Sequence, residues 1–145
     1  MNVLGRTLAF LLIVIHGGLL IWALVGFLEF HPEWVFTDIS NPLFGRTTLL
    51  WQWSIVAVAS LAYLLGFGFR MHWLPEIMTV FYGVMAITCA YQTFFILLHD
   101  SRFMQMAIEF LEYTLILWIL YRNVWFERWL GRKQNTPTGS VETDR

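Results

Sequence analysis

Charged residues are scarce in this chain and are missing from three long stretches of it. Asp, Glu, Lys and Arg make up 13% of the 145 residues, whereas hydrophobic residues make up 58%. In soluble domains charged residues average about 25% and apolar residues about 45–50%. Three long runs, residues 7–28, 47–69 and 77–98, contain no Asp, Glu, Lys or Arg at all. A soluble core in so short a chain could not bury these runs, which excludes a soluble globular domain.

Cysteine and clusters of basic residues are lacking as well. Cys89 is the single cysteine, so an intrachain disulfide and a dithiol redox centre are both excluded. We interpret Cys89 as a small buried hydrophobic residue. The net charge is −1, and no basic stretch is long enough to follow a phosphate backbone. Nucleic acid is therefore not expected as a partner.

What the chain does have is apolar runs of membrane-spanning length. The three runs without charge are followed by a fourth at residues 103–121. Each has about 20 residues, enough to cross a hydrocarbon core of about 30 Å as a helix. We predict an all-α integral membrane protein in which four transmembrane helices form an antiparallel up-down bundle. The helices are expected at about 7–28, 47–69, 77–98 and 103–126.

The distribution of basic residues predicts the orientation of this bundle. We expect one transmembrane domain over residues 1–133 and a polar, mobile tail over 134–145. Placing both termini inside puts seven of the nine Lys and Arg residues inside, as the positive-inside rule favours. We therefore expect a bacterial inner-membrane protein with both termini cytoplasmic. The seven residues are Arg6, Arg70, Arg122, Arg128, Arg132, Lys133 and Arg145.

Two carboxylates, Glu109 and Glu112, interrupt the fourth run. They are three residues apart and share a helical face, which we expect to face the second and third helices or a partner rather than lipid. Depths estimated from the helical rise bring further polar side chains toward the same layer. Such a layer either holds helices together or binds a proton, cation or polar ligand. Its other predicted members are Gln52, Gln92, Tyr91 and His16.

Motifs for catalysis or cofactor binding are lacking. His31, Glu33, His99 and Asp100 are the candidate metal ligands, but their spacing is irregular, so no metal is expected. Only His16 lies deep in a run, which leaves bis-histidine haem without its second ligand. No nucleophile or phosphate-binding motif is present, and no cofactor is indicated. We interpret Gly17-Gly18 and Gly66-Phe67-Gly68 as sites of close helix packing or flexible ends.

These observations predict a small non-catalytic accessory subunit of a larger inner-membrane complex, such as a transporter, respiratory or photosynthetic assembly. Its partners would be the bilayer and other membrane subunits, or copies of itself. The first alternative is a small oligomeric, proton-coupled carrier or channel that uses Glu109 and Glu112. A membrane enzyme that binds a metal or a quinone is a third possibility.

Overall fold

All regular secondary structure in the described part of the chain is helical. The computed structural model describes residues 3–28, 30 and 44–131. Each of four long helices is long and apolar enough to cross a membrane, which confirms the four predicted apolar spans. A short fifth helix follows them. The helices are α1 (Val3–Leu28), α2 (Arg46–Gly68), α3 (Leu74–Phe95), α4 (Arg102–Arg122) and α5 (Val124–Trp129).

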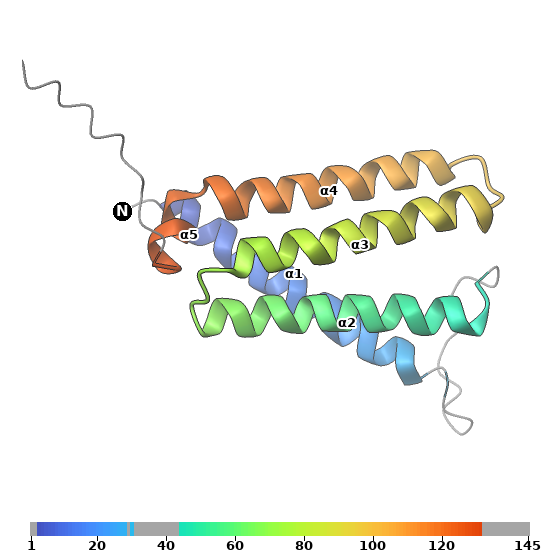
Figure 1. The fold of residues 1–145 in the computed structure, drawn as a ribbon, viewed down its shortest axis with the longest axis horizontal. Helices are drawn as coiled ribbons and strands as arrows, with labels where there is room; N and C mark the ends of the chain where they lie inside the picture. Colours follow the sequence, from blue (N-terminus) through green and yellow to red (C-terminus); the bar gives the residue numbers. More distant parts are fainter. Residues whose placement is uncertain (1–2, 29, 31–43, 132–145) are drawn as a thin grey trace, which may run out of the picture.

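The helices pack in a sequence of neighbouring pairs, α1 with α2, α2 with α3, and α3 with α4 (Figure 1). The start of α1, the connection between α2 and α3, and α5 lie together at one end of the molecule, here named the α5 end. The start of α2 and the connection between α3 and α4 lie at the opposite end. At the α5 end the short helix also packs against α1, so the last helix contacts the first.

The core is divided into two clusters of unequal size. The smaller one, in α1 and α2 alone, consists of Ala23, Leu49, Trp53 and Val56. The larger one draws on every helix. Helix α4 contributes only Ile119 and Leu120, its two buried residues. The larger cluster contains Ala9, Leu12, Tyr63, Leu74, Met78, Tyr82, Ile119, Leu120, Phe126 and Leu130.

Gly26 of α1 lies directly against the Trp53 side chain of α2. A Cβ atom placed on Gly26 would overlap the indole ring of Trp53. Trp53 is 2% exposed and meets Trp22 edge-on, with 4.7 Å between ring centroids. Small residues allow helix backbones in membranes to come this near. Gly26 therefore makes room for the largest side chain of the smaller cluster.

The fourth helix ends earlier than the sequence predicts. In place of one helix over residues 103–126, α4 stops at Arg122 and α5 begins at Val124. Asn123 has extended backbone angles, and its side-chain oxygen accepts a hydrogen bond of 3.0 Å from the Trp125 amide. An asparagine in this conformation caps the start of a new helix. Beyond this break the Phe126 side chain packs in the larger cluster.

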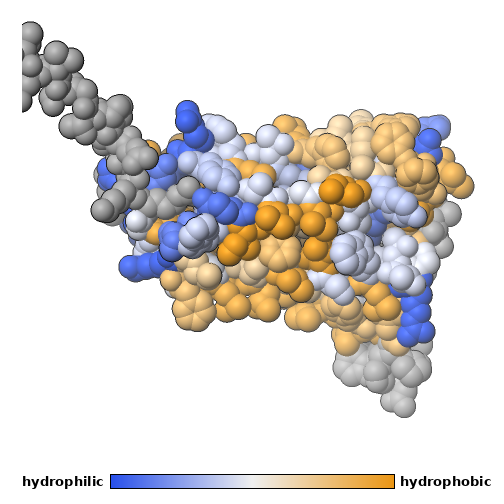
Figure 2. Space-filling model, in the orientation of Figure 1, coloured by the Kyte–Doolittle hydropathy of each residue, from blue (hydrophilic) through white to orange (hydrophobic). Residues whose placement is uncertain are grey.

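The surface agrees with helices that face lipid. Figure 2 shows apolar residues over the middle of the visible face, with the most hydrophilic residues mainly toward the two ends. Large apolar side chains are exposed on all four long helices, and examples are Phe10, Leu61, Val80 and Leu111. In a soluble protein an apolar surface of this extent would drive association.

Candidate functional site

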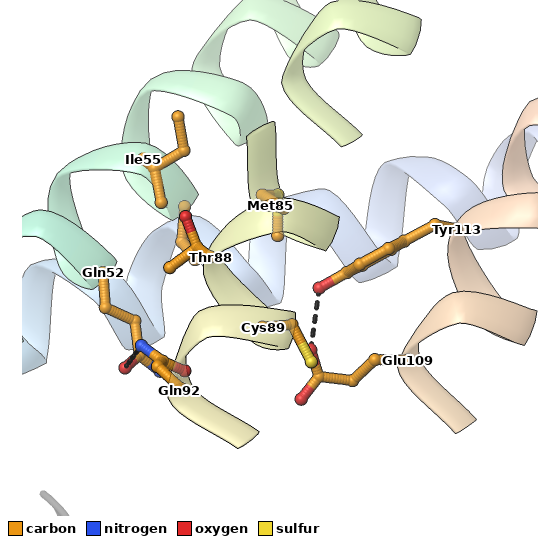
Figure 3. A pocket seen from close by; sticks show the side chains of 9 residues that line it. Gln52, Ile55, Met85, Thr88, Cys89, Gln92, Glu109 and Tyr113 are labelled. Atoms are coloured by element: carbon orange, nitrogen blue, oxygen red, sulfur yellow. Dashed lines mark hydrogen bonds between the residues drawn. The ribbon is translucent and has the colours of Figure 1, made fainter. Parts of the chain in front are cut away.

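A small polar cavity lies between α2, α3 and α4 (Figure 3). Its volume is about 60 Å³, which is enough for water or a small ion. Each of the three helices contributes polar side chains, so the cavity is where the membrane-embedded polar groups of separate spans meet. The lining consists of Gln52, Ile55, Val56, Met85, Thr88, Cys89, Gln92, Glu109 and Tyr113.

Glu109 supplies the carboxyl group of this cavity. It is half-buried and accepts a hydrogen bond of 2.9 Å from the Tyr113 hydroxyl, one turn further along α4. Figure 3 shows the thiol of Cys89 beside the carboxyl group. The carboxyl is thus directed at α3 and has a local hydrogen-bond donor. The same group exposed to the bilayer centre would cost at least about 2.5–3.5 kcal/mol.

Amide and hydroxyl groups complete the polar lining and join α2 to α3. The amide nitrogen of Gln92 donates to the side-chain oxygen of Gln52 at 3.3 Å. Thr88 accepts a hydrogen bond of 3.0 Å from the Trp51 indole and donates one of 2.9 Å to the Val84 carbonyl. The structure thus brings Gln52, Gln92 and Glu109 of the predicted layer to one cavity.

Glu112 is separated from this cavity, contrary to the expectation that the two carboxylates turn the same way. It is exposed and does not line the cavity. The physical reason is the helical rotation of about 100° per residue, which turns positions three apart about 60° from each other. Helix α3 covers the side of α4 that holds Glu109 and leaves Glu112 outside. Glu112 is also the central residue of α4, ten residues from either end.

Tyr91 also lies outside the polar cavity. It is 56% exposed, and its ring contacts Phe95 with 5.2 Å between centroids. Together with Trp51 and Gln92 it lines a larger, mostly apolar cleft of about 420 Å³ between α2 and α3. Thr88 and Gln92 line both spaces, so the cleft and the cavity adjoin.

His16 is buried away from the cavity, between two tyrosines. Its Nδ1 must donate to the Leu12 carbonyl at 2.7 Å, because a carbonyl oxygen only accepts. In the neutral ring Nε2 then accepts a hydrogen bond of 2.8 Å from the Tyr82 hydroxyl. The imidazole stacks on Tyr63 with centroids 3.8 Å apart. Every polar atom of this histidine therefore has a partner inside the bundle.

Ring contacts join His16 to the cavity indirectly. Tyr82 stacks on Tyr113 with 5.3 Å between centroids, and Tyr113 donates to Glu109. Tyr63 and Tyr82 lie outside the polar layer predicted from the sequence. A usable signal was present for Tyr82, since a tyrosine deep in an uncharged run needs a hydrogen-bond partner when it is buried, whereas the buried Tyr63 hydroxyl has no such partner in the described part of the chain. His16 is the one histidine deep in a run and was the available acceptor.

The candidate metal ligands do not form a centre in the part of the chain that is described. His31 and Glu33 lie outside the described residues. His99 shares a hydrogen bond of 3.1 Å with the Ser101 hydroxyl. Within residues 3–28, 30 and 44–131, no three or more His, Cys, Asp or Glu side chains are grouped so that they could hold a metal ion.

Comparison with known proteins gives no relative from which a function could be transferred. No family model matches the chain, and no match is found among curated proteins or among solved structures. The placement of the chain's own polar and charged groups is therefore the basis for a functional assignment.

Proposed function

We propose that this chain is a non-catalytic accessory subunit of a larger complex in a bacterial inner membrane, such as a transporter, respiratory or photosynthetic assembly. It crosses the membrane as an antiparallel up-down bundle with both termini in the cytoplasm. The charge distribution supports this orientation. Arg6, Arg70 and Arg122 belong to the α5 end, whereas Arg46 and Arg102 belong to the opposite end. The α5 end is then the cytoplasmic one.

The exposed carboxyl group of Glu112 is the observation that supports an accessory subunit. It lies at the middle of α4, which is the least buried of the four spans. At the bilayer centre, lipid exposure of such a group is costly, and intramembrane carboxyls normally face other protein groups. A neighbouring subunit packed on α4 would cover Glu112.

The test is the stability of the native complex with Glu112→Leu. Leucine needs no polar partner, so the chain should insert normally but bind its neighbours up to about tenfold more weakly, because an intramembrane hydrogen bond contributes up to about 1.7 kcal/mol. The measurement is the yield of co-purifying subunits in mild detergent.

Glu109→Gln is the matched control for the assembly test, because Glu109 faces the cavity inside the bundle and the amide oxygen still accepts the hydrogen bond of Tyr113. It should leave the yield of the complex unchanged. A wild-type protein that purifies from native membranes as a lone 17.1 kDa monomer would contradict the proposal.

The alternative is a small oligomeric, proton-coupled carrier or channel, and the cavity around Glu109 is the observation in its favour. A carboxyl that faces a water-sized space can exchange a proton. The apolar cluster that fills the α5 end weighs against it, because that cluster separates the cavity from the cytoplasmic side.

Flux in proteoliposomes tests the carrier. Proton flux driven by a pH gradient, followed with an internal pH dye, should fall at least about tenfold in Glu109→Gln, since the amide cannot carry the proton. Glu112→Gln is the comparison from the same helix. Flux that is unchanged in both variants would eliminate the carrier.

A further inference from the structure

The exposed side of α4 has the residue spacing of a helix-packing surface. Five large apolar side chains follow one another at alternating steps of four and three residues, and each is between 49% and 67% exposed. This is the spacing at which one helix packs along another at a small crossing angle. The stripe covers about 21 Å of helix at 1.5 Å per residue, so it fits a partner helix that itself crosses the membrane. The stripe consists of Met104, Ile108, Leu111, Leu115 and Trp118.

Glu112 flanks this stripe at its centre, next to Leu111, and the rest of the described chain does not supply it with a donor. No hydrogen bond within residues 3–28, 30 and 44–131 reaches its carboxyl group. The nearby hydroxyl of Thr114 donates its proton to the Phe110 carbonyl at 2.8 Å. A helix packed on the stripe would therefore have to bring a hydrogen-bond donor or a positive charge to the depth of Glu112.

A second copy of this chain does not bring a positive charge to this depth. Two copies with the same orientation place equivalent residues at equal depth, so a symmetric contact through α4 sets one Glu112 carboxyl against the other. The arginines of the four spans, Arg6, Arg46, Arg102 and Arg122, all lie within about one turn of a helix end. None of them reaches the middle of a neighbouring copy.

We propose that α4 binds a transmembrane helix of a different protein, and that a lysine or arginine near the middle of that helix pairs with Glu112. The proposal rests on the accessory-subunit function given above and specifies the chemistry of the partner. Ionisable groups inside membranes pair with one another because neither is well solvated by lipid. The apolar stripe supplies the packing, and the ion pair fixes the depth of one helix against the other.

Synthetic transmembrane helices provide the test. Leu/Ala peptides with a single central Arg, Lys, Asn or Leu are labelled with an acceptor fluorophore and reconstituted with donor-labelled protein in phosphatidylcholine vesicles. Energy transfer should report association of the Arg and Lys peptides at least about tenfold tighter than that of the Leu peptide. Glu112→Leu should abolish this preference, and Glu109→Gln, which keeps an acceptor for Tyr113, should retain it.

Three results would overturn the proposed pairing. The Arg, Lys and Leu peptides could associate equally, the Asn peptide could associate most tightly, or energy transfer between copies of the protein itself could depend on Glu112. Co-purification from native membranes tests the accessory-subunit function separately, so that function stands if the assembly still co-purifies when the proposed pairing fails. A lone monomer in native membranes would instead contradict that function, whatever the peptides do.

Discussion

Replacing Gly26 with leucine is expected to destabilise the packing of α1 on α2 by about 3 kcal/mol, the upper end of the usual range for overpacking. A Cβ atom alone at this position would overlap the Trp53 ring, and the longer side chain adds to the conflict. Trp53 cannot move aside easily, because it is buried and held edge-on by Trp22. Gly26→Ala, a milder change, should destabilise by about 1 kcal/mol or more in the same way.

Gly18 provides a matched control on the same helix. No atom lies within 4 Å of a Cβ placed on Gly18, so Gly18→Ala and Gly18→Leu should be neutral or slightly stabilising, since glycine is a poor helix former. Reversible unfolding in mixed detergent micelles, titrated with a denaturing detergent, measures all four variants. Equal stability of the Gly26 and Gly18 variants would show that α1 and α2 do not approach at Gly26.

Replacing His16 with leucine is expected to cost about 1–3 kcal/mol of stability. The change removes the acceptor of the Tyr82 hydroxyl, and it leaves that hydroxyl buried in an apolar part of the bundle with no partner. It also removes the ring that stacks on Tyr63. The direct hydrogen bond accounts for only part of the loss, because such bonds in membranes average about 0.6 kcal/mol. The unsatisfied hydroxyl accounts for much of the rest.

A double-mutant cycle with Tyr82→Phe separates these contributions. Phenylalanine at position 82 leaves the His16 Nε2 atom without its donor, so this variant should also be destabilised. The double variant lacks both polar atoms and should cost less than the two single changes together, with a coupling on the order of 1 kcal/mol. Additive effects in the same micelle unfolding measurement would show that the two side chains do not share a hydrogen bond.

The four spans were predictable because few structures satisfy every backbone hydrogen bond inside lipid. Within a hydrocarbon layer only helices and closed barrels pair all of their amide groups, so uncharged runs of about 20 residues specify helices by length alone. The end of α4 was not predictable on this basis. Apolar residues resume at Val124 and Trp125 after Arg122 and Asn123, and the break depends on the conformation of one residue, Asn123.

The polar layer was only partly predictable. The depth of a residue follows from its position along the helix, whereas the direction of its side chain follows from how the helix is rotated against its neighbours. Rise per residue placed Gln52, Gln92 and Glu109 at one level, and the structure brings these three to one cavity. Which way each helix turns depends on its neighbours, and that information is missing from a single sequence. Glu112, Tyr91 and His16 match the layer in estimated depth but do not line the cavity.

Glycine positions illustrate the same limit. The pair Gly17-Gly18 and the segment Gly66-Phe67-Gly68 were interpreted as places of close packing or flexible ends. A Cβ on Gly66 would meet Leu74, but a Cβ on Gly17, Gly18 or Gly68 would meet no side chain within 4 Å. The tightest such contact is at Gly26, an isolated glycine without a sequence signal of its own. Glycine spacing identifies possible contacts, and the side chain opposite decides which are used.

The contribution of Phe126 and Leu130 to the larger cluster has a consequence for biosynthesis. That cluster cannot be completed until the ribosome has passed residue 130. The smaller cluster needs only α1 and α2, so this pair is able to associate while the later spans are still being made. The chain would thus acquire its structure in two stages, with an early hairpin and a late closure. A ribosome that stops after α4 would release a bundle that is open at its α5 end.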